Sequence, residues 1–158
     1  MEPQQLVILG GTRFLGTPLL PRLVADGNHI VLLSRTREHK RALGVLPNVH
    51  VRTADVHDPA SLRRELRGAD AAINLVGILN PQRHQSFQHV HVELPDKLIE
   101  ACRATGVGRL HQMSALKAGQ GLSQYLKSRG EMEEHVRASA LDWTLYQPSV
   151  MFGEGDGL

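Results

Sequence analysis

Short apolar runs alternate with segments of helical periodicity along the whole chain, and this alternation restricts the fold more than anything else in the sequence. The apolar runs lie at 5–10, 29–34, 49–53, 71–77, 109–114 and 143–147. The segments between them, at 13–26, 37–43, 59–67, 88–105 and 123–140, place apolar residues three and four positions apart. Strands joined by helices form right-handed crossovers, so we predict an α/β fold: a doubly wound, mostly parallel sheet with helices on both faces.

The size and composition of the chain suit one globular domain. At 158 residues it is long enough to bury an apolar core without disulfides or a structural metal, and we treat 1–158 as a single domain. No run approaches the roughly eighteen apolar residues that a membrane span requires. The single cysteine, Cys102, excludes an internal disulfide and favours a reducing, cytoplasmic location.

Charge and aromatic content argue against a nucleic-acid partner. The formal net charge is +2, the Lys and Arg residues are dispersed, and aromatic residues make up 4% of the chain. Among the nine histidines, His89 and His91 stand two positions apart in a predicted helix, where they do not share a face. We interpret the histidines as scattered surface and loop residues and predict no metal site.

A glycine-rich turn follows the first predicted strand. Gly10 allows the backbone to turn sharply, Gly11 and Thr12 line the turn, and Gly16 allows the following helix to approach the strand closely. The helix N-terminus then directs amide groups and partial positive charge at the carboxyl edge of the sheet, an arrangement that suits a diphosphate. The alternative interpretation is an ordinary tight turn.

Basic residues near this turn indicate the type of dinucleotide. Arg13 stands where a dinucleotide-binding fingerprint has its middle glycine, which adds a guanidinium beside the phosphates. Ser34 and Arg35 end the second strand, where a site for NAD carries Asp or Glu. We therefore predict NADP(H) as the preferred cofactor and NAD(H) as the alternative. The simpler interpretation of Arg35 is a solvated surface charge.

With these residues in place, the chain resembles the extended and atypical short-chain dehydrogenase/reductases, which are epimerase/dehydratase-like. Several of its segments are similar to a narrower subgroup, the one related to the NADPH-holding accessory subunit of mitochondrial complex I. The motifs that carry the resemblance are GGTRFLG (10–16), ADVHDPASL (54–62), INLVGIL (73–79), the segment 87–116 and the segment 141–158. The resemblance implies a Rossmann-like NAD(P)-binding domain at 1–158 from which the family's C-terminal substrate lobe is absent.

The resemblance also implies the residues that contact the cofactor, with Asp55 and Val56 flanking the adenine. These residues are Gly10, Gly11, Thr12, Arg13, Phe14, Leu15, Gly16, Ser34, Arg35, Asp55, Val56, Leu75, Val76, Gly77, Met113, Tyr125 and Pro148.

Active members of the superfamily use a Ser, a Tyr and a Lys, and the matching positions here hold Ser114, Tyr125 and Arg129. A cation four residues from a Tyr on a helix can depress the pKa of the phenol, and Arg129 supplies that charge. An arginine cannot release a proton, however, and its planar fork meets a ribose hydroxyl differently from an ammonium. Lys127 lies two residues from Tyr125, on another face of the helix, and does not substitute.

Two functions therefore remain open from the sequence. The first is an NADP(H)-binding module of a larger quinone-linked protein complex with weak or no catalysis, as the complex I resemblance implies. The second is an active NAD(P)-dependent reductase or nucleotide-sugar epimerase/dehydratase. The resemblance also makes peripheral association with the inner membrane an alternative to a free cytoplasmic location. Asn74 and His91 are weaker site candidates, since either can instead satisfy buried backbone.

Overall fold

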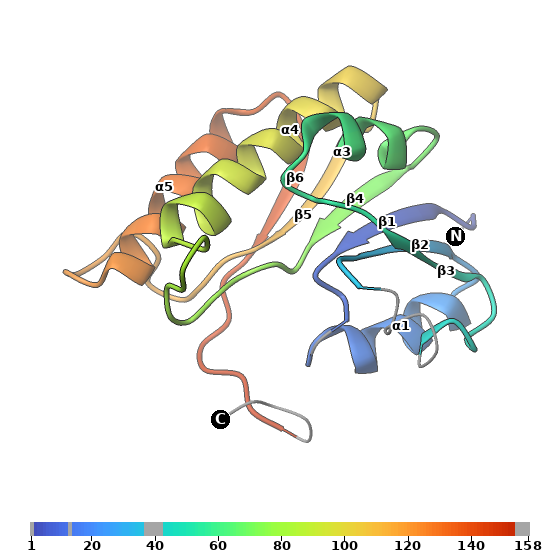
Figure 1. Ribbon diagram of the computed structural model, residues 1–158, viewed down its shortest axis with the longest axis horizontal. Helices are drawn as coiled ribbons and strands as arrows, with labels where there is room; N and C mark the ends of the chain where they lie inside the picture. Colours follow the sequence, from blue (N-terminus) through green and yellow to red (C-terminus); the bar gives the residue numbers. More distant parts are fainter. Residues whose placement is uncertain (1, 13, 37–42, 154–158) are drawn as a thin grey trace.

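The computed structural model of the chain contains a six-stranded parallel sheet (Figure 1). The structure describes residues 2–12, 14–36 and 43–153. The strands are β1 (Gln5–Leu9), β2 (His29–Ser34), β3 (Val49–Thr53), β4 (Ala71–Asn74), β5 (Arg109–Met113) and β6 (Asp142–Tyr146). Their spatial order, β3-β2-β1-β4-β5-β6, reverses direction between β1 and β4, where open α/β sheets bind ligands.

Helices lie on both faces of the sheet, which confirms the predicted fold class. They are α1 (Gly16–Ala25), α3 (Pro59–Leu66), the π-helical turn η1 (Gln88–Glu93), α4 (Leu94–Thr105) and α5 (Gln124–Ala138). Helix α1 covers one face beside β1 to β3, and α3, α4 and α5 cover the other (Figure 1). The helix predicted at 37–43 falls almost entirely on 37–42, outside the described residues.

The alternation of side chains in β1 explains the unbroken apolar run at the start of the chain. Val7 and Leu9 pack in the cluster under α3, α4 and α5, whereas Ile8 packs with Leu20 of α1 on the opposite face. Each fully buried aliphatic side chain stabilises the fold by about 1.5–3 kcal/mol. A strand covered on both faces has no polar side to show in the sequence.

Local signals place the helix ends. Asp58 accepts a hydrogen bond from the Ala60 N–H at 3.1 Å, and Pro59 occupies the first position of α3. Gly27 and Gly106 follow α1 and α4 with φ of 88° and 77°, the left-handed backbone expected there. Pro18 is the third residue of α1. The N–H groups of the first turn of a helix have no partner within the helix, so the proline removes no hydrogen bond there. Pro21 lies in the interior of α1 on its exposed side, and the helix continues to Ala25.

The predicted helix at 88–105 is interrupted by a change of hydrogen-bond pattern. The Leu94 N–H bonds to the His89 carbonyl, five residues back, so η1 is wider than an α-helix. Pro95, at the start of α4, has no N–H for the carbonyl of residue 91, and its ring would clash with that carbonyl in a regular helix. The wider turn accommodates the proline within one continuous helical segment.

The strand predicted at 71–77 ends at Asn74. The Leu75 N–H still donates to the Leu9 carbonyl at 2.8 Å, but the Val76 N–H donates to Asn74 Oδ1 at 3.1 Å. This side-chain bond turns the backbone out of the sheet and makes Leu75–Gly77 a loop at the carboxyl edge.

Helix α5 packs closely against the loop that follows β5. The Gly119 N–H donates to the Leu126 carbonyl at 2.7 Å, and a Cβ on Gly130 would lie 2.6 Å from the Gly119 nitrogen. We predict that Gly130→Ala lowers the free energy of unfolding by roughly 1–3 kcal/mol, although alanine is the better helix former. Urea denaturation measures this change. Gly108→Ala is the control, because nothing lies within 4 Å of its added Cβ, and equal effects of the two variants would refute the close-packing argument.

Candidate functional site

The turn after β1 is held against the loop that follows β4. Gly10 has φ of 79°, and a Cβ there would lie 2.8 Å from the Val76 nitrogen. A side chain at this position would therefore both strain the backbone and push the Leu75–Gly77 loop away. The two loops lie on either side of the point at which strand order reverses.

Helix α1 begins directly against the same turn. A Cβ on Gly16 would collide with the Gly11 carbonyl oxygen, and one on Gly11 would lie 2.5 Å from Leu32 Cδ1. These contacts confirm the close approach that the glycine spacing predicts. The first turn of α1 contains no acidic residue, and no side chain of the described residues caps it. It presents the positive end of the helix dipole to the carboxyl edge and so fits an anionic group.

Other predicted contact residues flank this turn. Thr12, Phe14 and Leu15 are partly exposed, and Arg13 lies outside the described residues. The segment after β6 passes beside the turn, since the position of a Cβ on Gly153 is 3.4 Å from Phe14 Cζ. The turn is thus in contact with a segment from the far end of the sheet.

The ends of β2 and β3 supply the residues assigned to the adenosine half. Ser34 is buried, and its hydroxyl donates to the Thr36 carbonyl at 3.1 Å, while Arg35 is exposed. Val56 is buried, and the exposed Asp55 accepts a hydrogen bond from the His57 N–H at 2.9 Å. Because β2 and β3 are parallel neighbours with Ser34 opposite Thr53, these residues share one edge of the sheet.

The hydroxyl of Ser114 is bonded within the protein. It donates to Glu133 Oε1 at 2.6 Å, and both residues are buried. The same carboxylate accepts from Gln147 Nε2 at 2.8 Å and from Arg137 Nη2 at 3.1 Å. Glu133 therefore joins the ends of β5 and β6 to α5.

The guanidinium of Arg129 is also turned inward. It is 4% exposed, Nη1 donates to the Met113 carbonyl at 3.2 Å, and the group lies 5.6 Å from the centre of the half-buried Tyr125 ring. A Cβ on Gly77 would collide with Arg129 Nη2. Burial lowers the pKa of Arg129, while Tyr125 and Glu133 oppose that change. Arg129 Nε is buried and has no hydrogen-bond partner among the described residues.

Asn74 and His91 both satisfy buried backbone, as the alternative interpretation of the sequence allowed. Asn74 is fully buried, its Oδ1 accepts from the Val76 N–H at 3.1 Å, and its Nδ2 donates to Gln112 Oε1 at 3.0 Å. His91 is fully buried between Phe87 and Tyr125, and its Nε2 accepts from the Ile78 N–H at 3.1 Å. The expectation that the histidines are surface and loop residues is therefore wrong for His91.

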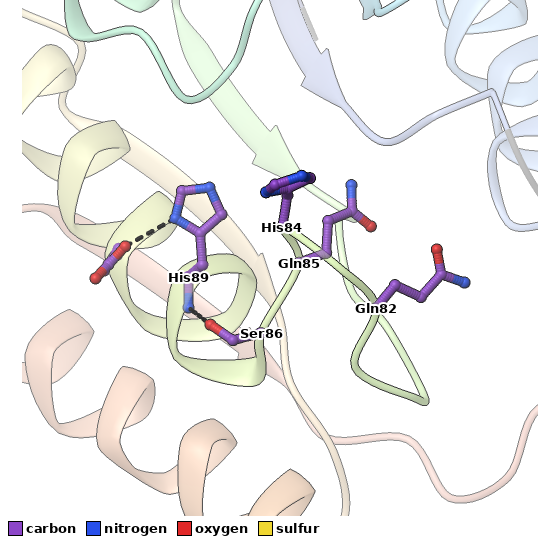
Figure 2. A pocket seen from close by; sticks show the side chains of 6 residues that line it. Gln82, His84, Gln85, Ser86 and His89 are labelled. Carbon is purple, nitrogen blue, oxygen red and sulfur yellow. Dashed lines mark hydrogen bonds and ion pairs between the residues drawn. The ribbon is translucent and has the colours of Figure 1, made fainter.

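A polar surface hollow of about 410 Å³ opens beside the end of β4 (Figure 2). Its lining consists of Gln82, His84, Gln85, Ser86, His89 and Glu93. His89 Nδ1 lies 2.8 Å from Glu93 Oε2, and the His89 ring stacks on the His57 ring with 4.1 Å between the ring centroids. Among the described residues, no group of three His, Cys, Asp or Glu side chains is arranged to hold a metal ion.

Comparison with known proteins identifies the family. A protein-family model described as NAD(P)H-binding matches residues 10–157, so the chain belongs to this NAD(P)H-binding family. It is 28% identical over 155 residues to the mitochondrial NADH-ubiquinone oxidoreductase 40 kDa subunit of Neurospora crassa, covering 96% of this chain and 41% of the relative. It is 31% identical over 153 residues to the ceramide reductase of Caulobacter vibrioides, covering 96% and 47%.

A solved structure confirms the fold. The Bordetella bronchiseptica enzyme WbmH in complex with NAD+ matches 99% of this chain and 59% of its own, with a TM-score of 0.81 at 16% identity. The predicted resemblance to NAD(P)-binding short-chain dehydrogenase/reductases with complex I relatives is thereby confirmed. The chain spans less than half the length of the two curated relatives, at 41% and 47%. No helix in the described part of the chain is long and apolar enough to cross a bilayer.

Sequence reasoning missed Glu133, although a signal for it exists. Tyr125, Arg129 and Glu133 follow one another at intervals of four, so they lie along one side of α5. A carboxylate in register with two candidate site residues indicates a shared network. Gln147 also bonds to Glu133 but gives no comparable signal in the sequence. The two residues meet only because α5 packs against the sheet.

The charge state of His91 predicts a pH dependence of stability. Burial and the nearby Arg129 lower the pKa of His91 from 6.5 to about 3. Between these values the unfolded chain binds a proton that the folded chain does not, so stability falls as the pH drops below 6.5. We expect this residue to contribute about 1 kcal/mol of that loss per pH unit.

The measurement is urea denaturation from neutral pH to mildly acidic pH for the wild type and for His91→Asn, which removes the titrating group. The stability of the variant should depend less steeply on pH. Parallel curves for the two proteins would contradict a neutral, buried His91.

Proposed function

We propose that the chain is an NADP(H)-binding module of a quinone-linked protein complex, with weak or no catalysis of its own. The observation that carries the proposal is the inward bonding of two groups that proton transfer would need. The Ser114 hydroxyl proton is donated to Glu133, and Arg129 is buried against the Met113 carbonyl. The relationship to a subunit of NADH-ubiquinone oxidoreductase supports assembly into such a complex.

The residues present fit the cofactor. Glycines at 10, 11 and 16 leave a turn that side chains would fill, in front of a helix end without a side-chain cap from the described residues. This turn would hold the diphosphate, Arg35 would face the 2′-phosphate, and Asp55 and Val56 would flank the adenine. When bound, the dihydronicotinamide supplies a hydride.

An active reductase is the second candidate, and Tyr125 favours it. The phenol ring is half-buried at the carboxyl edge, with the Arg129 cation 5.6 Å from its centre. This cation–π contact holds the ring in place, and Tyr125 stands at the position of the tyrosine that active members of the superfamily use. The relationship to a ceramide reductase gives this candidate support from the comparisons as well.

Cofactor preference is tested by isothermal titration calorimetry. We expect NADPH to bind more tightly than NADH, and Arg35→Ala to weaken NADPH about tenfold with little effect on NADH, because a charge-assisted contact to phosphate is lost. Arg67→Ala is the matched control, since Arg67 is exposed at the end of α3, at the opposite edge of the sheet. Equal affinities for the two cofactors would remove the argument for NADP(H).

Turnover separates the two candidate functions. We expect NADPH oxidation in the presence of aldehydes, ketones and short-chain quinones to stay at the background rate, and Tyr125→Phe to leave that rate unchanged. The measurement is the loss of NADPH absorbance. Oxidation well above background that disappears in Tyr125→Phe would favour the reductase.

A further inference from the structure

His91 has both ring nitrogens bonded in a fully buried position. Nε2 accepts the Ile78 N–H at 3.1 Å and therefore carries no proton. In a neutral imidazole the proton then lies on Nδ1, which is 2.8 Å from Ser128 Oγ. The Ser128 hydroxyl donates in turn to the Tyr125 carbonyl at 2.8 Å. These groups form a directed chain of hydrogen bonds, which we call the His91 clasp.

The His91 clasp joins three parts of the carboxyl edge. Ile78 directly follows the Leu75–Gly77 loop after β4, His91 comes from η1, and Ser128 and Tyr125 come from the first turns of α5. The Phe87 ring stacks on His91 at 5.3 Å, and the Tyr125 ring meets it edge-on at 5.3 Å. The imidazole and the Ser128 hydroxyl therefore link the loop after β4, through Ile78, to the first turns of α5.

The width of η1 brings His91 to this position. The hydrogen bond from the Leu94 N–H to the His89 carbonyl, five residues back, rotates the turn relative to a regular helix, and His91 is buried while His89 lines the surface hollow. Single π-helical turns of this kind are common at functional sites. The clasp is thus a product of the same backbone change that accommodates Pro95.

The clasp lies on one side of the site. Arg35 and Asp55 follow β2 and β3, whereas Ile78 and Tyr125 adjoin β4 and β5 on the other side of β1. A dinucleotide whose diphosphate lies at the β1 turn and whose adenosine half lies toward β2 must extend its other half over β4 and β5. The clasp therefore adjoins the nicotinamide half.

We propose that His91 is a positioning residue for the nicotinamide half of the dinucleotide, acting through Ile78 and Ser128. This inference rests on the proposed function. The His91 clasp fixes the 75–77 loop relative to Tyr125 before the ligand binds. It therefore lowers the entropic cost of ordering this part of the site when the nicotinamide half binds. The adenosine half, held by other loops, does not depend on it.

The test compares a whole ligand with its adenosine half. Calorimetry gives dissociation constants for NADPH and for adenosine 2′,5′-bisphosphate with the wild type, His91→Asn and Ser128→Ala. We expect both variants to bind NADPH about tenfold more weakly and the bisphosphate unchanged, since only the nicotinamide half loses its preorganised contacts. Far-ultraviolet circular dichroism checks that each variant folds. If His91→Asn does not fold, Ser128→Ala still tests the proposal, because it removes one bond of the clasp and keeps the buried imidazole.

Ser139→Ala is the matched control, because Ser139 ends the same helix and its hydroxyl donates only to the Val136 carbonyl among the bonds of the described residues. Unchanged NADPH affinity in Ser128→Ala, or equal weakening of both ligands, would overturn the clasp while leaving the proposed function standing. If the wild type binds neither ligand, the proposed function fails and this inference fails with it.

Discussion

The close approach of helix α1 to the turn before it is the contact on which the carboxyl edge depends. A Cβ on Gly16 would collide with the Gly11 carbonyl, and one on Gly10 would reach the backbone of Val76. A larger residue at Gly16 would move α1 outward, and one at Gly10 would move the 75–77 loop outward. The turn proposed to hold a diphosphate therefore depends on three glycines that allow backbone to pack on backbone, and the flanking loops take their positions from that packing.

Across the same edge, the two sides of the site differ in how their polar groups are bonded. Arg35 and Asp55, beside β2 and β3, are exposed to an incoming ligand. The polar groups beside β4 and β5 are buried, and their hydrogen bonds join different elements. Ser114 bonds to Glu133, Arg129 bonds to the Met113 carbonyl, and His91 accepts from the Ile78 N–H. Opening such a network leaves buried polar groups without partners, which costs about 1–3 kcal/mol each. The side beside β4 and β5 is thus held rigid.

Elements whose signal is local could be predicted from the sequence. The alternation of runs defines the parallel sheet, Asp58 and Gly106 place helix ends, and the glycine spacing locates the turn on which α1 packs closely. The π-helical turn escaped prediction because its apolar spacing is that of a helix, and only the hydrogen bond to His89 distinguishes it. The partners of Ser114 could not be predicted either, since Glu133 and Gln147 reach it only through tertiary packing.

The inward bonding of Arg129 supports the proposal that the site holds a cofactor without efficient catalysis. A guanidinium has more donors than an ammonium, and here Nη1 already bonds to Met113 O while Nη2 fills the space beside Gly77. It cannot swing toward a ribose hydroxyl without breaking its bond to that carbonyl, nor can it pass on a proton. The Arg129 cation still lies over the Tyr125 ring, but an arginine does not provide the proton relay that a lysine at this position can. The contacts proposed for the β1 turn and for Arg35 need neither, so under the proposed function the dinucleotide binds without a catalytic relay.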